Sequence, residues 1–212
     1  MLRVNEIFHS IQGESTHAGR PCVFVRLTGC PLRCVWCDTA YAFHEGSPMS
    51  VEAIVERVLS YGCPLVEVTG GEPLAQPRSI DLLRALLDRR LEVLLETSGA
   101  LPIAAVPSGV KRIVDVKCPG SGEAHRNLWE NLDALREGDE IKFVVAARAD
   151  YDWAKRVVQE RGLDRRAPVL FSAVRETLDP GVLASWVLED RLPVRLQVQM
   201  HKVLWPTALR GV

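Results

Sequence analysis

Three cysteines within eight positions are the residues of this sequence that point most clearly to chemistry. Cys30, Cys34 and Cys37 are separated by three and then two residues, and Trp36 precedes the last one. Zinc sites usually have paired two-residue spacings and need four ligands, whereas iron-sulfur clusters are held by cysteine thiolates. Three thiolates without a fourth nearby favour an iron-sulfur cube in which one iron stays open. An open iron can bind a non-protein ligand and do chemistry.

Core packing and disulfide bonding both fit the three cysteines less well. Buried cysteines are usually part of a periodic apolar pattern, but here Pro, Arg and Trp lie between them. Disulfide frameworks are typical of much shorter secreted chains, and because charges occur early in this 212-residue sequence we do not expect a secretory h-region at its start. We therefore expect a reducing, cytoplasmic compartment. A non-catalytic zinc module, held by the three cysteines and His44, stays open as an alternative.

The composition is that of an ordinary globular protein. Hydrophobic residues make up 47% and charged residues 25% of the chain, and the formal net charge is −1. A chain of this length fits one domain, residues 1–212, that buries roughly 70% of the surface that the unfolded chain exposes. Charges of both signs are interspersed, which does not favour a nucleic-acid or lipid surface. No apolar run reaches the roughly 18 residues that a membrane span needs.

Apolar, β-branched runs alternate with helical patterns along the sequence, which indicates strands joined by helices. Ser50 and Ser79 each precede a run with apolar residues on one helical face, so both are expected to be helix N-caps. Strands are expected at 22–28, 65–69, 91–97, 111–117, 141–145, 169–172 and 194–199, and further helices at 128–135, 151–159 and 180–188. This order predicts parallel strands with right-handed crossovers. Because some helices are short or missing, we expect an α/β fold with an incomplete barrel.

The unusual residues follow the ends of successive predicted strands. The cysteine loop at 29–39 follows the first strand, Gly70 to Pro73 the second, Ser98 and Gly99 the third, and residues 118–122 the fourth. The carboxyl ends of parallel strands meet at one rim, where ligands gather in such folds. The sequence therefore predicts that these four segments form one active site.

The cysteine spacing with its aromatic Trp36 resembles the signature of the radical S-adenosylmethionine (SAM) superfamily. The resemblance implies a radical SAM core, a partial TIM-like barrel, with a 4Fe-4S cluster on the three thiolates. It also implies that SAM chelates the open iron and that reductive cleavage of SAM leads to hydrogen abstraction from a substrate. The motif Gly70-Gly71-Glu72-Pro73 fits this, because paired glycines let backbone carbonyls approach the SAM ammonium group.

The flanking segments resemble a narrower family. Glu6-Ile-Phe-His-Ser-Ile-Gln-Gly-Glu14, Gly19-Arg-Pro21 and Cys37-Asp-Thr39 are similar to segments of the 7-carboxy-7-deazaguanine synthases. This resemblance implies a lyase of queuosine and 7-deazapurine biosynthesis, which converts 6-carboxy-5,6,7,8-tetrahydropterin to 7-carboxy-7-deazaguanine with loss of ammonia. It further implies a need for Mg2+, a reductant such as flavodoxin or ferredoxin, and a homodimer.

The same resemblance assigns roles position by position. Thr39 matches the magnesium ligand, which suits a hard ion that prefers oxygen and keeps its waters. Arg26 matches the residue that holds the substrate carboxylate, and Glu14 would accept bonds from pterin N–H groups. Glu96 fits equally well as a pterin contact or as a structural carboxylate. The substrate-binding set comprises Ile11, Gln12, Gly13, Glu14, Arg26, Thr69 and Pro206, and the SAM-binding set Gly71, Asp115, Val116, Lys117, Phe171, Ser172, Ala173 and Val174.

The sequence departs from the family pattern at two strand ends. Asp115-Val116-Lys117 stands where many relatives have Ser-Pro-Lys, and the segment 171–174 stands where a Gln-Pro segment is common. Lys117 can still reach the cofactor under this alignment, and Phe171 can pack on a ring. Cys118 as a fourth cluster ligand would block the iron that the chemistry needs.

An activating enzyme that makes a glycyl radical on a protein partner stays open as a second alternative, since such enzymes are short and have the same cysteine motif. It would need a groove for that partner. Among the remaining residues, Cys22 and Cys63 are expected to be buried thiols, and the tryptophans Trp129, Trp153 and Trp186 to be core or dimer contacts.

Overall fold

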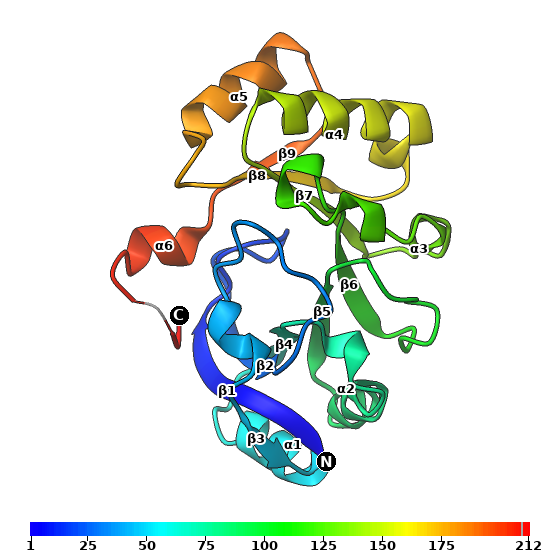
Figure 1. Ribbon diagram of the computed structural model, residues 1–212. Coiled ribbons are helices and arrows are strands. Elements are labelled where there is room, and N and C mark those ends of the chain that lie inside the picture. The colour runs from blue at the N-terminus through cyan, green and yellow to red at the C-terminus, as the bar shows by residue number, and fades with distance from the viewer. Residues whose placement is uncertain (209) are drawn as a thin grey trace.

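A single curved sheet organises the protein, with helices on its outer face (Figure 1). The computed structural model describes residues 1–208 and 210–212. The sheet has nine strands in the order β3-β1-β2-β4-β5-β6-β7-β8-β9. The strands are β1 (Leu2–Ile11), β2 (Pro21–Leu27), β3 (Ser47–Met49), β4 (Leu65–Gly70), β5 (Glu92–Thr97), β6 (Val110–Asp115), β7 (Glu140–Val145), β8 (Val169–Ala173) and β9 (Arg195–Gln197).

The strands from β2 onward, apart from β3, are parallel as predicted, but the first part of the chain is different. The strands β1 and β3 were not expected, and both pair antiparallel, β1 with β2 and with β3. The sequence of β1 lacks a clean apolar alternation, and its register with β2 shifts between Val4 and Glu6. An interrupted alternation of this kind hides a strand from pattern analysis. The expectation of parallel strands throughout is therefore wrong for this edge of the sheet.

The α-helices are α1 (Val51–Leu59), α2 (Ser79–Asp88), α3 (Glu130–Asp133), α4 (Arg148–Arg161), α5 (Pro180–Glu189) and α6 (Met200–Leu204). Short 3-10 turns occur at Ala40–Phe43, Pro73–Ala75, Pro119–Ser121, Ala124–Arg126 and Leu163–Arg165. The expectation of short or missing helices is confirmed, since α3 has a single turn and no α-helix joins β5 to β6. Helix α6 was not predicted from the sequence.

One predicted helix cap is confirmed and the other is wrong. The Ser50 hydroxyl accepts a hydrogen bond from the backbone N–H of Ala53, as an N-cap does. Ser79 instead lies inside the first turn of α2, and the cap position is occupied by Arg78, which makes no side-chain cap bond. The Ser79 side chain is fully buried, and its hydroxyl has no partner among the described residues.

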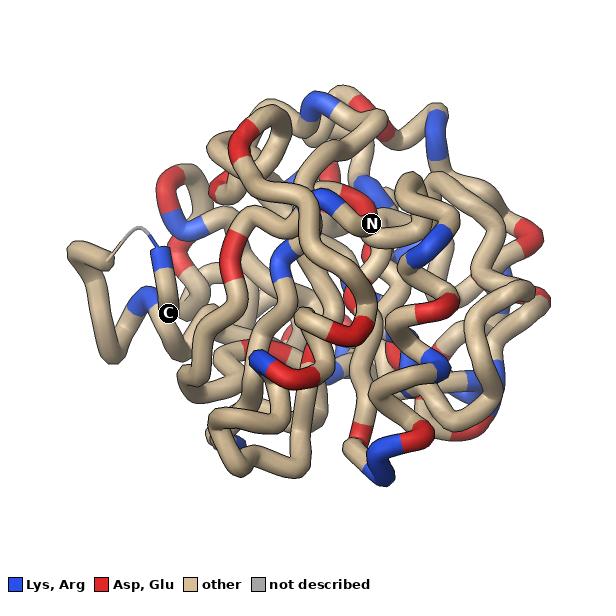
Figure 2. Tube along the Cα trace, turned by 90° about the horizontal axis from the view of Figure 1, so that it is seen from below, with Lys and Arg blue, Asp and Glu red and all other residues tan. Residues whose placement is uncertain are grey.

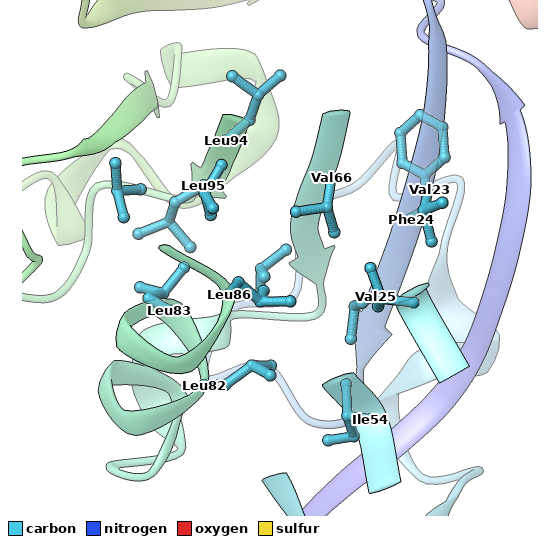
Figure 3. Close-up of a cluster of buried hydrophobic side chains, with 14 of the residues drawn as sticks. Val23, Phe24, Val25, Ile54, Val66, Leu82, Leu83, Leu86, Leu94 and Leu95 are labelled. Atoms are coloured by element: carbon cyan, nitrogen blue, oxygen red, sulfur yellow. The ribbon is translucent and has the colours of Figure 1, made fainter. Parts of the chain in front are cut away.

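The helices bury the outer face of the sheet in two apolar clusters. Helices α1 and α2 cover the half formed by β2, β4 and β5, and Leu82, Leu83 and Leu86 of α2 belong to the same buried cluster as Val66 and Leu95 of the strands (Figure 3). Helices α4 and α5 cover β7 and β8 with a second cluster that contains Tyr151, Phe143 and Phe171. With the outer face packed in this way, the polar side chains of the strands are left to the inner face.

The sheet does not close into a full barrel. Its two edges are β3 beside β1 and, at the other end, β9. Helix α6 lies at the opening between β9 and β1 (Figure 1), and the backbone N–H of Met200 donates to the carbonyl of Gly13 at 3.0 Å. The incomplete barrel predicted from the sequence is confirmed.

Charged residues of both signs are distributed along the whole trace (Figure 2). Among the described residues, none of the helices combines the length and apolar character that crossing a membrane requires.

Candidate active site

One cavity runs from the cysteine loop into the interior of the barrel and out to α6. It brings together side chains that are far apart in sequence, from the segment after β1 to the last residue, Val212. Of the residues predicted for the site, the following line it: Ile11, Gln12, Gly13, Glu14, Arg26, Cys30, Cys34, Cys37, Thr39, Thr69, Gly71, Asp115, Lys117, Ser172, Ala173 and Val174.

The cysteine loop is held at the rim by the backbone of the Gly-Gly-Glu-Pro segment. The N–H of Gly71 donates to the carbonyl of Leu27 at 3.0 Å, and the N–H of Glu72 donates to the carbonyl of Gly29 at 2.8 Å. A Cβ atom on Gly71 would lie 2.1 Å from the Gly29 carbonyl oxygen. Glycine is thus required here by the close approach of two loops of the protein itself. A contact between Gly71 and SAM stays a prediction.

The glutamate of that segment is structural. Glu72 is fully buried, and its carboxylate accepts hydrogen bonds from the hydroxyls of Thr97 and Ser98 and from the N–H groups of Ser98 and Leu74. A carboxylate with this many donors is satisfied without a ligand. It joins the ends of β4 and β5 and so fixes the rim beside the cysteine loop.

The segment after β6 holds the other side of the cysteine loop. The N–H of Val35 donates to the carbonyl of Ser121 at 3.0 Å. The buried carboxylate of Asp150, at the start of α4, accepts from the N–H of Gly120 at 2.8 Å and from that of Ala146 at 3.2 Å. A buried anion that bonds two backbone segments keeps this loop in place.

The three thiols fit a cluster better than a single ion. All six cysteines are free, and Cys30, Cys34 and Cys37 are partly exposed to the cavity. Among the described residues, no three Cys, His, Asp or Glu side chains are gathered closely enough to hold one metal ion. In a cluster each thiolate binds a different iron, so wider spacing is expected. Burial raises the pKa of Cys34 to about 11, and the nearby Lys117 acts in the opposite direction.

Cys118 takes no part in this group. It is almost fully buried in the cluster of apolar residues under α4 and is not among the residues that line the cavity.

Arg26 reaches the cavity from β2 with a partner at one nitrogen only. Its Nε donates to Glu6 at 2.7 Å, and the same Glu6 oxygen accepts from the Tyr41 hydroxyl at 2.9 Å. Within the part of the chain that the structure describes, the two terminal nitrogens of Arg26 have no hydrogen-bond partner. A guanidinium held at Nε with its terminal N–H groups free is suited to a carboxylate.

The segment after β1 forms the floor of the cavity. Because β1 runs antiparallel to β2, this segment lies at the amino ends of the parallel strands, opposite the cysteine loop. It spans the barrel, since the N–H of Ser15 donates to Gln197 of β9 at 2.6 Å and Thr16 donates to Glu140 of β7. The sequence predicted the residues but placed no element at this end.

Both the oxygen and the nitrogen of the Gln12 side-chain amide form hydrogen bonds within the protein. Its oxygen accepts from the N–H of Glu14 at 2.8 Å, and its nitrogen donates to Glu67 of β4. Burial, together with the nearby carboxylates of Glu96 and Glu14, raises the pKa of Glu67 well above its usual value.

Lys142 of β7 connects two carboxylates inside the barrel. Its ammonium contacts Glu14 and lies 2.8 Å from an oxygen of Glu96, whose other oxygen accepts from Thr69 at 2.9 Å. Although burial acts to lower it, Glu14 and Glu96 hold the pKa of Lys142 well above its usual value. The lysine is therefore charged.

Thr39 lies beside Asp38 near the opening of the barrel. Its hydroxyl donates to Asp38 at 2.9 Å, and the second Asp38 oxygen is 3.2 Å from the ammonium of Lys202 in α6. Gln199 donates to both Asp38 and Glu14. The end of the chain thus connects the cysteine loop to the floor of the cavity.

Three predicted site residues do not line the cavity. The side chains of Val116 and Phe171 lie in the apolar cluster under α4, where Phe171 packs against Phe143 and Tyr151. The neighbouring positions on their strands face inward instead, because side chains alternate along a strand. Packing of Phe171 on a cofactor ring therefore does not fit this structure. Pro206 is exposed beyond α6, and Val212 lines the cavity in its place.

Several polar residues of the cavity were not predicted from the sequence. Four of them line it, namely Asp38, Glu67, Lys142 and Gln199. Three more hold Arg26 and Glu14 in place without lining it, namely Glu6, Tyr41 and Gln197. Glu67 and Lys142 could have been identified from the sequence, since each is a charged residue between apolar neighbours in a predicted strand. A charge in a buried strand needs a partner on the same face, which identifies it as a candidate for the cavity.

Several known proteins with similar sequences share one name. Residues 24–118 match the family model described as the Radical SAM superfamily. The 7-carboxy-7-deazaguanine synthase of Chlorobaculum tepidum is 49% identical, with 100% of this chain and 97% of that protein aligned. The protein of the same name from Koribacter versatilis is 46% identical over the full length of both chains.

Solved structures show the same fold. The crystal structure of QueE from Escherichia coli has a TM-score of 0.77 at 22% identity and covers 94% of each chain. Streptococcus suis SuiB, bound to S-adenosylmethionine, has a TM-score of 0.58 at 11% identity, covering 84% of this chain and 47% of that one. Taken with the full-length sequence identity, these likenesses show that the chain belongs to the 7-carboxy-7-deazaguanine synthase family of the radical SAM superfamily.

Proposed function

We propose that this protein is a radical SAM lyase that converts 6-carboxy-5,6,7,8-tetrahydropterin to 7-carboxy-7-deazaguanine with loss of ammonia, in queuosine or other 7-deazapurine biosynthesis. One observation carries this proposal beyond family membership. A single cavity joins three free thiols at the rim to a guanidinium and two lysine-bridged carboxylates in the barrel. Such a site matches a small, carboxylated, nitrogen-rich substrate.

Cys30, Cys34 and Cys37 would hold the 4Fe-4S cluster. The backbone of Gly71, the segment Asp115 to Lys117 and the strand end Ser172 to Val174 would contact SAM. The residues present fit SAM. The Lys117 ammonium lies 2.7 Å from a carboxylate oxygen of Asp115, and both residues line the cavity with the cysteines. They offer one charge of each sign to the zwitterionic amino-acid part of SAM. Together, the cluster and SAM supply hydrogen-atom abstraction from the bound substrate.

Arg26 would bind the substrate carboxylate. Its terminal nitrogens can donate two parallel bonds, while Glu6 and Tyr41 fix the plane of the guanidinium. Fixing one end of a small substrate orients its ring relative to the cysteine loop, which is how positioning contributes to rate.

Thr39 would supply a ligand to Mg2+, with substrate oxygens and waters completing the shell. The Asp38 carboxylate accepts a hydrogen bond from the Thr39 hydroxyl at 2.9 Å and would orient this single protein ligand toward the ion. The ion would fix the orientation of the substrate and stabilise negative charge that develops on its oxygens.

We further propose that residues 1–212 form one radical SAM domain that works in the reducing cytoplasm as a homodimer and receives electrons from flavodoxin or ferredoxin. Six free cysteines suit a reducing compartment. The exposed apolar residues Val198, Val203, Leu204 and Trp205 near the C-terminal helix offer a surface for a second subunit.

The test is turnover by the anaerobically reconstituted enzyme. We expect about four irons and four sulfides per chain and conversion of the carboxylated tetrahydropterin that Mg2+ stimulates. Thr39→Val should raise the Mg2+ concentration needed for half-maximal rate, whereas Thr16→Val, a threonine on the floor away from Asp38, should not. A full cluster with SAM cleavage but no pterin conversion would contradict the proposal and favour a glycyl-radical activator. One bound zinc and no iron would favour the metal-binding module.

A further inference from the structure

The ammonium of Lys142 lies between two carboxylates inside the barrel. It contacts one oxygen of Glu14 and lies 2.8 Å from one oxygen of Glu96. The lysine side chain is only 8% exposed. The three residues come from β7, from the floor segment and from β5, and all three line the cavity.

The hydrogen-bonding capacity of these groups is only partly used. The Lys142 ammonium has three N–H bonds, of which two go to Glu14 and Glu96, so one has no partner within the described part of the chain. Glu96 accepts from Lys142 and Thr69, which leaves about two of its roughly four acceptor positions open.

Glu14 retains about one open acceptor position. One oxygen accepts from Lys142 and from Gln197 at 2.9 Å, and the other accepts from Gln199 at 2.8 Å. Glu14, Lys142 and Glu96 form a triad in which the lysine is central. A ligand that faces the triad therefore meets an acceptor, a donor and an acceptor in that order.

The order of the triad selects one edge of a pterin. The central ammonium can only donate, so the ligand must place an acceptor between two donors. The edge with the ring carbonyl presents an acceptor followed by two donors, so its central N–H would oppose the Lys142 ammonium. The opposite edge of a tetrahydropterin presents a ring N–H, an unprotonated ring nitrogen and the exocyclic amine, which is the required order.

We propose that Lys142, together with Glu14 and Glu96, recognises this donor-acceptor-donor edge, with the Lys142 ammonium donating to the unprotonated ring nitrogen between the ring N–H and the exocyclic amine. The inference rests on the proposed function and assigns a specificity-determining residue to the same site. The product 7-carboxy-7-deazaguanine retains this edge, with its pyrrole N–H, its ring nitrogen N3 and its exocyclic amine.

The test compares two ligands on the reconstituted enzyme by equilibrium binding. One is 7-carboxy-7-deazaguanine, and the other is its analogue with N3 replaced by C–H. The wild-type enzyme should bind the first about tenfold or more tightly, because the analogue loses a bond from a charged donor. In Lys142→Met, affinity for the product should fall, and the two ligands should bind within about threefold of each other. A purely structural role for Lys142 would weaken both ligands and leave their ratio unchanged, which would overturn the proposal.

The matched control is Lys111→Met. Lys111 of β6 is also a strand lysine paired with a glutamate, 2.7 Å from Glu92, but it does not line the cavity. Its ligand ratio should equal that of the wild type. If Lys142→Met does not fold, the double variant Lys142→Met/Glu96→Gln replaces it, because this variant loses one charge of each sign. Its ligand ratio is then compared with that of the single variant Glu96→Gln. Failure of the wild type to convert the pterin would refute the proposed function, whereas conversion with an unchanged ratio in the Lys142 variant refutes only this inference.

Discussion

A side chain on Gly71 would collide with the carbonyl of Gly29, since a Cβ atom there would lie 2.1 Å from that oxygen. Gly29 begins the cysteine loop, and Gly71 follows β4. The two backbones therefore pack directly on each other, and the position of the cysteine loop depends on a missing side chain.

Gly71→Ala should displace the cysteine loop and impair cluster assembly, because the obstacle is backbone that cannot rotate away. Iron and sulfide content after anaerobic reconstitution measures the effect. Gly162→Ala is the control, since a Cβ there meets open space and only the positive φ of 59° is strained. It should cost about 1 kcal/mol of stability and retain the full cluster. A Gly71→Ala protein with normal iron content would contradict this account.

Cys34→Ala should abolish cluster assembly, whereas Cys118→Ala should preserve it. Cys34 lines the cavity, while Cys118 is buried in the apolar cluster under α4. The visible absorption of the reconstituted proteins distinguishes the two variants. Loss of the cluster in Cys118→Ala, with the fold intact by circular dichroism, would show that this thiol is a ligand.

Arg26→Ala should raise the KM for the pterin by about 10- to 100-fold, as expected for loss of a charge-assisted pair of hydrogen bonds. Cleavage of SAM in the absence of substrate should be unchanged. Glu6→Gln should give a smaller rise, because it only loosens the guanidinium held at 2.7 Å. An Arg26→Ala enzyme with wild-type KM would refute the assigned role.

Asp139→Ala should destabilise the protein by about 3 to 5 kcal/mol, because it leaves a buried guanidinium without its anion. Arg112 and Asp139 have side chains that are 0% and 1% exposed. Urea denaturation measures the change. The exposed pair of Arg78 and Asp81, 3.3 Å apart, provides the comparison, and Asp81→Ala should cost about 1 kcal/mol or less. Equal losses in the two variants would contradict the burial argument.

Glu92 should contribute to stability at neutral pH and cease to do so in acid. Hydrogen bonds from Arg20 and Lys111 lower its pKa to about 2 from 4.5. A carboxyl with a lowered folded-state pKa stabilises fully above the unfolded value, and this contribution is lost as the pH falls from about 4.5 toward 2. The difference in unfolding free energy between wild type and Glu92→Gln, about 1 kcal/mol or less for a partly exposed pair, should shrink across this range. A difference that stays constant below pH 4 would rule out this ionisation as its source.

The sequence predicted the parallel strands well because their apolar runs and the turns between them are local signals. Ser50 as a cap and the cysteine loop after β2 are of this kind. The strand β1 was not predicted because it is defined by its pairing with β2, which includes a bulge. Such pairing is a contact between two segments and is not visible in the sequence of either one. Ser79 was misjudged because the sequence does not show that its side chain is buried, and α2 begins one residue earlier than a cap at Ser79 would require.

By itself, the sequence determined which residue types are available and that the loops after β2, β4, β5 and β6 share one rim of the sheet, since spacing and strand order are properties of the chain. It identified the cysteines, Arg26, Glu14 and Thr39 by pattern and resemblance. Only the tertiary structure decided that Phe171 faces the helices and that Lys142 stands between Glu14 and Glu96. The sheet curves, and the segment after β1 crosses to β7 and β9. Charged residues more than 40 positions apart, such as Glu96 and Lys142, therefore become neighbours. A buried charge is stable only where the fold supplies its partner.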